Sequence, residues 1–120
     1  MDQARKKELI SQYKQTKPPM GVFIIRSHVN NKYYIQGAKD LRAVINGAQA
    51  RLASGMHPNR ELQKEWQEFG SEKFTIEILE HLEYDKDEAK TDYSEDLAVL
   101  QGFWEEKLAE EHLEMYKKRI

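Results

Sequence analysis

Two short apolar runs on either side of an Asn-Asn pair constrain the fold of this chain more than any other feature. Residues 22–25 read VFII and residues 32–35 read KYYI, and β-branched and aromatic residues favour β-strands. Asn30 and Asn31 lie between the runs, and asparagine tolerates the positive φ angles that tight turns require. The sequence therefore predicts a β-hairpin over residues 22–35.

Two helices are predicted to follow the hairpin. Asp40 precedes an apolar stripe with helical spacing and is a typical N-cap residue, and residues 54–55 (Ser-Gly) end the segment. Residues 57–59 (His-Pro-Asn) open the second helix, which Gly70 ends. The two stripes consist of Leu41, Val44, Ile45, Ala48 and Leu52 in the first helix, and of Leu62, Trp66 and Phe69 in the second.

A third strand and a last helix are predicted in the second half of the chain. Residues 73–82 alternate between apolar and polar side chains, which is typical of a half-buried strand. Residues 83–95 are strongly acidic and predict a surface loop. The last helix is expected from about Tyr93, and its apolar stripe consists of Leu97, Leu100, Trp104 and Leu108.

This order of elements predicts a small α+β domain with a three-stranded antiparallel sheet flanked by helices. The domain is expected over residues 20–110. Residues 1–19 are predicted to form an extra N-terminal helix, over residues 2–16, and a linker that contains Pro18 and Pro19. Residues 111–120 are expected to form the end of the last helix and a tail.

Composition excludes several classes of protein and site. The 120 residues are 39% apolar and 33% charged, which indicates one folded domain. The absence of cysteine excludes disulfides and thiolate nucleophiles, and the four histidines lack the spacing of a zinc site. No apolar run approaches the length of a membrane span and no signal peptide is recognised, so we expect a cytoplasmic protein that does not bind membranes.

Charge is distributed unevenly along the chain. Residues 1–60 contain 11 Lys and Arg against 3 Asp and Glu, whereas residues 61–120 contain 8 against 18. The basic half could contact phosphates of DNA or RNA. The alternative is that the opposite charges of the two halves face each other and neutralise each other, or simply face the solvent.

The hairpin and the first helix resemble the GIY-YIG endonuclease family, which occurs in phage intron homing endonucleases and in excision-repair nucleases. GVF at residues 21–23 matches the first motif, and YIQ at residues 34–36 matches the second. The similarity continues without gaps through residues 38–41 and extends to about residue 108. The resemblance implies a metal-assisted hydrolysis of a phosphodiester bond.

The resemblance also implies roles for particular positions. In the family, a first-motif tyrosine helps to activate water, a second tyrosine lies beside it, an arginine on the first helix holds the phosphate, and a histidine supports the site. A glutamate on the last helix binds one divalent ion. The matching positions in this chain are Phe23, Tyr34, Val44, Ala48 and Gln101, and a loop histidine matches His57.

Of these positions, only Tyr34 and His57 retain the family side chain. Phe23 lacks the hydroxyl group, Val44 and Ala48 lack the charge and the imidazole, and a neutral Gln101 is a poor ligand for a hard cation. We therefore expect a degenerate, catalytically inactive nuclease-like domain without a cofactor.

Two other residues bear on this interpretation. Gln36 stands at the motif glycine, and shifting the register by one residue would place Gly37 there but would misalign residues 38–41. Gln101 is expected to face inward, and a buried amide requires hydrogen-bond partners, for which Tyr34 is a candidate.

The predicted function is binding of nucleic acid or of a protein partner. The candidate nucleic-acid-binding residues are Lys32, Lys39, Arg42 and Arg51. A first alternative is a residual Mg²⁺-dependent endonuclease with a rearranged site, which would combine Tyr34 and His57 with Glu95, Glu105 or Glu106. A second alternative is an oligomerising module built on the N-terminal helix.

Overall fold

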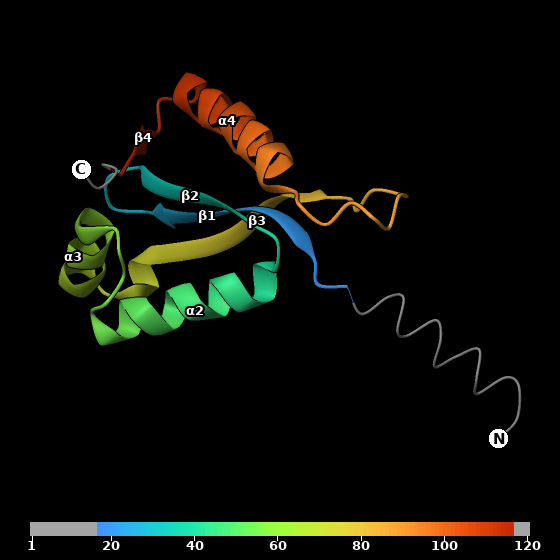
Figure 1. Cartoon of the computed structure of the whole chain (residues 1–120). Helices are drawn as coiled ribbons and strands as arrows, with labels where there is room; N and C mark the ends of the chain where they lie inside the picture. Colours follow the sequence, from blue (N-terminus) through green and yellow to red (C-terminus); the bar gives the residue numbers. More distant parts are fainter. Residues whose placement is uncertain (1–16, 117–120) are drawn as a thin grey trace, which may run out of the picture.

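The computed structural model describes residues 17–116, which form one sheet with helices on both faces (Figure 1). The N-terminal helix predicted over residues 2–16, and with it the oligomerising alternative, lies outside the described residues. Helices α2 (Leu41–Ser54) and α3 (Arg60–Phe69) lie on one face of the sheet, and α4 (Ser94–Glu110) lies on the other. None of the described helices is long and apolar enough to cross a membrane.

Strand β1 (Met20–Ser27) is the centre of the sheet. It pairs antiparallel with β2 (Lys32–Ala38) on one side and with β3 (Phe74–Leu82) on the other. The β1–β2 turn contains Asn31 at a φ of 58°, as the Asn-Asn pair predicts. A short 3-10 turn, Ser71–Lys73, leads into β3. The predicted hairpin and third strand are confirmed.

The sheet has a fourth strand, so the prediction of three antiparallel strands is wrong. Strand β4 (Glu114–Met115) pairs parallel with β2 and gives the order β3-β1-β2-β4. The Tyr116 N–H donates to the Tyr33 carbonyl at 2.8 Å, which continues this pairing. Residues 111–116, expected as a helix end and tail, therefore reverse direction after α4 and cover the open edge of β2. A strand of two residues is too short to show a periodicity, so it could not be predicted from the sequence.

Side chains at the helix ends set the limits of the helices as the sequence predicts. The Asp40 carboxylate accepts a hydrogen bond from the Ala43 N–H at 3.1 Å, and Gly55 ends α2 at a φ of 80°. The side chain of Asn59 caps α3 by accepting from the Leu62 N–H at 3.0 Å, and Gly70 follows its last residue. Each cap satisfies backbone groups that a helix end would otherwise leave without a partner.

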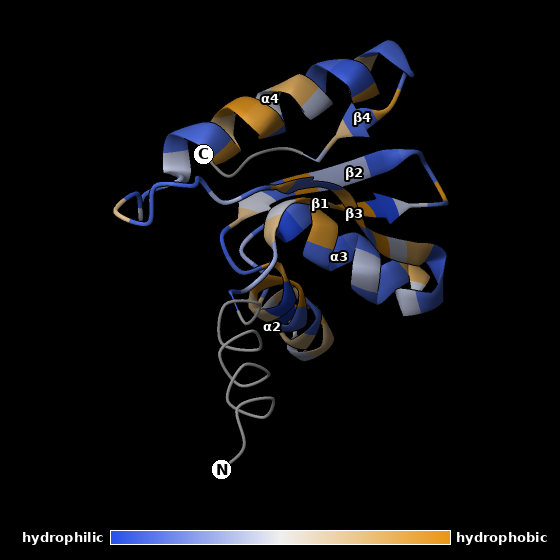
Figure 2. Cartoon of the chain, turned by 90° about the vertical axis from the view of Figure 1, so that its right-hand side faces the viewer, coloured by the Kyte–Doolittle hydropathy of each residue, from blue (hydrophilic) through white to orange (hydrophobic). Residues whose placement is uncertain are grey.

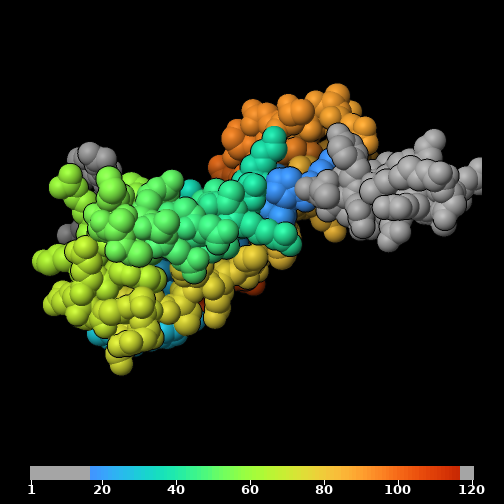
Figure 3. All heavy atoms as spheres, turned by 90° about the horizontal axis from the view of Figure 1, so that it is seen from below, coloured from blue at the N-terminus to red at the C-terminus, as the bar shows by residue number. Residues whose placement is uncertain are grey.

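The alternation of side chains along β1 divides the core into two layers. Phe23 and Ile25 pack toward α2 and α3, whereas Val22 and Ile24 pack toward α4. Figure 2 shows the apolar colouring of the central strand and the mixture of polar and apolar residues along the helices. Burial on both faces explains why β1 reads as a continuous apolar run rather than an alternating one. Figure 3 views the molecule from the side of α2 and shows α3 at one end of this helix.

Candidate functional site

The structure gathers most of the positions that the resemblance singles out on the α2 side of the sheet. Phe23 and Ala48 belong to one buried apolar cluster, and Tyr34 and Val44 pack against it. The rings of Tyr34 and His57 meet edge to face, with their centroids 5.0 Å apart and an angle of 87° between their planes. Sequence positions separated by up to 34 residues therefore form one site.

Apolar packing fills the part of this site where the family has reactive groups. Phe23 is 0% exposed and offers no oxygen to a water molecule. Ala48 is also buried and Val44 is half-buried, so this stripe of α2 serves to pack the helix on the sheet. The positions that the resemblance matches to a tyrosine, an arginine and a histidine therefore carry no hydroxyl, charge or imidazole in this chain.

Tyr34 retains its hydroxyl group, but a neighbouring side chain engages it. The hydroxyl donates to Gln36 Oε1 at 3.0 Å, and both residues lie on β2. Burial raises the pKa of Tyr34, and the nearby Arg51 charge lowers it to a smaller extent. The phenol is therefore neutral at pH 7 and acts as a hydrogen-bond donor rather than as a base.

His57 is buried and held in one orientation by the α2–α3 loop and by α3. Its backbone N–H donates to Gln63 Oε1 at 2.9 Å, and its Nδ1 accepts from the Asn59 N–H at 3.0 Å. Since Nδ1 accepts a hydrogen bond, the ring proton resides on Nε2. Burial lowers the pKa of His57, so the ring is neutral at pH 7 and offers Nε2–H as a donor.

Gln101 lies on the other side of the strand from Tyr34, and the prediction that Tyr34 is its partner is wrong. Gln101 Oε1 accepts from the Gly37 N–H at 3.0 Å, and its Nε2 donates to Glu105 Oε1 at 3.0 Å. α4 approaches β2 closely at this point, since a Cβ on Gly37 would lie 3.2 Å from Leu97 Cβ. The amide thus fastens α4 to the sheet.

The donor groups around Gln101 do not fit a site for Mg²⁺. The amide oxygen already accepts a hydrogen bond, and Glu105 is the one carboxylate in contact with this side chain. Between residues 17 and 116, no group of three His, Cys, Asp or Glu residues could hold a metal ion. A hard divalent ion requires several oxygen ligands, carboxylates above all.

The other two carboxylates of the alternative site lie apart from Gln101. Glu95 lines a separate groove with Leu82, Val99 and Phe103. Glu106 is exposed, and no hydrogen bond or ion pair joins it to the described part of the chain. Only Glu105 therefore touches a position that the resemblance singles out.

The four candidate nucleic-acid-binding cations differ in their surroundings. Lys32 Nζ lies 3.5 Å from Glu61 Oε1 and 3.7 Å from Glu65 Oε2, so its charge is compensated within the chain. Lys39 Nζ donates to the Thr91 carbonyl at 2.6 Å. Arg42 and Arg51 are exposed on α2.

Arg51 is the cation that belongs to the site. Its charge lowers the pKa of both Tyr34 and His57, so it lies near both rings. If Gly47 carried a Cβ atom, this atom would lie 3.6 Å from Arg51 Nη2. The guanidinium of Arg51 therefore extends back along α2 toward the position of Val44. From the sequence alone, Arg51 is only one of four candidate basic residues. The i, i+7 spacing from Val44, which places both residues on one face of a helix, could have singled it out.

Comparison with solved structures agrees with this geometry. The catalytic domain of the homing endonuclease I-TevI matches with a TM-score of 0.63 and 25% identity, over 82% of this chain and 99% of that chain. This chain has a nuclease-like fold. A point mutant of the same intron endonuclease domain matches with a TM-score of 0.61 and 26% identity, over 82% of this chain and 92% of that chain. No protein-family model and no curated protein matches. The likeness supports the resemblance to GIY-YIG nuclease domains and a nuclease-like function.

Proposed function

We propose that this domain is a degenerate GIY-YIG-type nuclease domain that binds nucleic acid without hydrolysing it. The observation that carries the proposal is the apolar cluster at the reactive positions, where Phe23, Val44 and Ala48 pack together beneath Tyr34. A base near the nucleophile contributes about 10²–10⁴ in rate, and each 1.36 kcal/mol of lost transition-state stabilisation is about tenfold in rate. Losses within one site are not additive, but any one of these leaves little activity.

The side chains that remain favour binding. Arg51 provides a permanent charge, and His57 Nε2–H is a neutral donor. Gln36 Nε2 makes no hydrogen bond within residues 17–116, because only its oxygen is engaged, by Tyr34. A cation and two neutral donors on one face suit the oxygens of a phosphate group.

Incubation of the full chain with supercoiled plasmid and Mg²⁺ or Mn²⁺ tests the absence of hydrolysis. We expect the plasmid to stay supercoiled at every protein concentration. Gln101→Glu is expected to be equally inactive, because Phe23 and Val44 still lack the hydroxyl and the cation. Nicking that grows with protein concentration and stops with chelator would show that the domain is an active nuclease.

Fluorescence anisotropy with labelled DNA and RNA at low salt tests the binding. Arg51→Gln is expected to weaken binding of both, with Lys107→Gln as a control that removes one positive charge from α4 on the other face of the sheet. If neither DNA nor RNA binds at low salt, the nucleic-acid function is wrong and a protein partner is the better proposal.

Two contacts favour the second candidate function, a residual endonuclease. Tyr34 and His57 still touch, and Glu105 contacts Gln101, so three titratable groups lie near the positions where the family has its site. This candidate predicts chelator-sensitive cleavage that Tyr34→Phe abolishes. The poor fit of the donor groups to a metal ion is the reason for ranking it second.

A further inference from the structure

A polar groove opens next to His57. It lies between the α2–α3 loop and α3 and has a volume of about 590 Å³. Among residues 17–116, no aromatic ring other than the His57 imidazole lines it. Its main lining residues are Gly55, His57, Arg60, Gln63, Lys64 and Gln67. The catalytic positions of the resemblance do not include the polar residues of α3 that line this groove.

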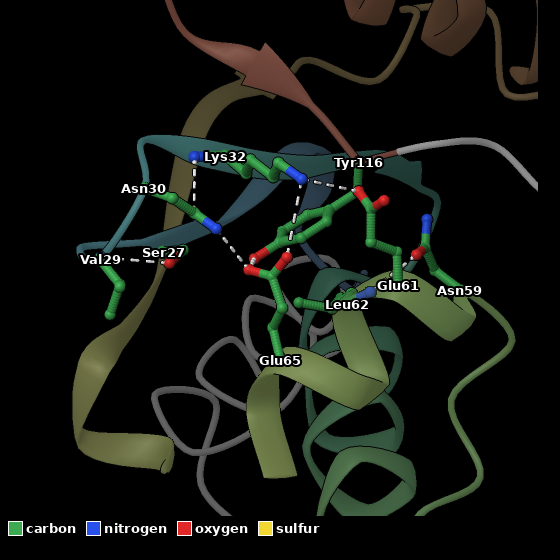
Figure 4. Close-up of polar contacts among 9 residues, drawn as sticks. All are labelled: Ser27, Val29, Asn30, Lys32, Asn59, Glu61, Leu62, Glu65 and Tyr116. Carbon is green, nitrogen blue, oxygen red and sulfur yellow. Dashed lines mark hydrogen bonds and ion pairs between the residues drawn. The ribbon is translucent and has the colours of Figure 1, made fainter. Parts of the chain in front are cut away.

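The first two turns of helix α3 carry two cations on one face and two carboxylates on the neighbouring face. Arg60 and Lys64 are four residues apart, so they lie one turn apart on the face that lines the groove. Glu61 and Glu65 repeat the same spacing on the adjacent face and turn toward the hairpin, where they meet Lys32 (Figure 4). These two carboxylates are thus directed away from the groove, and the two cations line it. The third carboxylate of the helix, Glu68, lies one turn beyond Lys64 and is not among the groove residues, and it forms no ion pair within residues 17–116.

The groove cations have no acidic partner in the described part of the chain. Neither Arg60 nor Lys64 forms an ion pair with any residue in 17–116, and both side chains are exposed. By contrast, Lys32 and Lys90 are both ion-paired. Two uncompensated cations in a concave polar surface attract an anion more strongly than two cations on a convex one.

The groove and the site described above share His57. The ring of His57 contacts Tyr34, while residues 55–58 of the same loop form a wall of the groove. Arg51 lies one turn before the end of α2, where Gly55 begins this wall. Arg60 and Lys64 therefore line the groove, and Arg51 lies near its lining residue His57 and near Tyr34.

We infer that this groove binds the sugar–phosphate backbone of a nucleic-acid strand, with Arg60 and Lys64 contacting successive phosphates on the path that leads to Tyr34. The inference rests on the proposed function and adds the path of the strand and the mode of contact. Recognition is of the backbone rather than of the bases, because the groove offers no tyrosine, tryptophan or phenylalanine ring for stacking. Binding through this groove is therefore independent of base sequence.

The test measures how the affinity of the full chain for nucleic acid depends on salt. Labelled 20-nucleotide single strands and 20-base-pair duplexes of two unrelated sequences are titrated by anisotropy at a series of NaCl concentrations. The test variant is Arg60→Gln/Lys64→Gln. The control is Lys86→Gln/Lys107→Gln, which removes the same charge from the acidic loop and from α4. Circular dichroism verifies that both variants fold, as expected for substitutions of exposed side chains.

We expect the slope of log K against log[NaCl] to become shallower by about 1.4–1.8 in the test variant, since each phosphate contact contributes about 0.7–0.9. The loss should be equal for the two sequences, and the control slope should equal that of the unmodified chain. If the chain binds but the test and control slopes agree, the groove is not the path, although the proposed function stands. If the unmodified chain does not bind at low salt, both proposals are wrong.

Discussion

The carboxylate of Glu65 holds three distant parts of the chain together, and removing one of its hydrogen bonds gives the sharpest test of the fold. Glu65 is 9% exposed, and its Oε1 accepts from Asn30 Nδ2 at 2.7 Å and from the Tyr116 hydroxyl at 2.8 Å (Figure 4). Its Oε2 lies 3.7 Å from Lys32 Nζ. The carboxylate thus connects the hairpin turn, α3 and the segment after β4.

The perturbation is Tyr116→Phe, which removes the hydroxyl and keeps the ring in the core. Tyr116 is 1% exposed, so water does not replace the lost donor. A hydrogen bond to a charged group contributes about 1.5–3 kcal/mol to stability. Asn30 and Lys32 continue to satisfy the carboxylate in the variant. We therefore expect the free energy of unfolding to fall by about 1.5 kcal/mol, the lower end of that range.

Urea unfolding of the full chain, followed by circular dichroism, measures this change. The midpoint should fall while the m-value stays constant. Tyr34→Phe is the matched control, because its hydroxyl donates to the neutral amide of Gln36, and such a bond contributes about 0.5–1.5 kcal/mol. A double-mutant cycle with Glu65→Gln should give a coupling energy of about 1 kcal/mol between positions 65 and 116. A coupling near zero, or an unchanged midpoint in Tyr116→Phe, would refute this account of Glu65.

Three further predictions concern particular residues. Burial and the hydrogen bond to Glu65 raise the pKa of Tyr116 above 10.0. The stability that the protonated hydroxyl contributes is therefore fully present below pH 10 and is lost as the pH rises further. Above pH 10, the free energy of unfolding should fall less steeply in Tyr116→Phe than in the unmodified chain. Gly21→Ala should lower stability by about 3 kcal/mol in the same urea assay, because the new Cβ would lie 2.1 Å from the Glu80 carbonyl oxygen of the paired strand; Gly102→Ala, which has no atom within 4 Å of the new Cβ, should not lower it. The ¹⁵N NMR shifts of His57 should show the Nε2–H tautomer and a pKa below 6.5, and a ring that is charged at pH 6.5 would contradict the assigned hydrogen bond from Asn59.

The sequence by itself determined the local elements and the identity of the groups at the reactive positions. The Asn-Asn turn, the Asp40 cap, Gly55 at a positive φ and the alternation in β3 depend on interactions between residues close in the chain. Phe23 and Val44 likewise lack a hydroxyl and a charge whatever their surroundings. These features could be predicted because short-range sterics and the chemistry of a side chain do not depend on the rest of the fold.

Only the tertiary structure decided how the remaining polar side chains are used. Gln101 bonds to Gly37 rather than to Tyr34 because neighbouring residues of β2 face opposite sides of the sheet. Lys32 was predicted to contact nucleic acid, yet Glu61 and Glu65 compensate its charge from a helix about 30 residues further along. Strand β4 exists because the chain turns back at residues 111–113 and reaches the free edge of β2. Such contacts follow from register and packing between distant segments, which no local pattern of residues specifies.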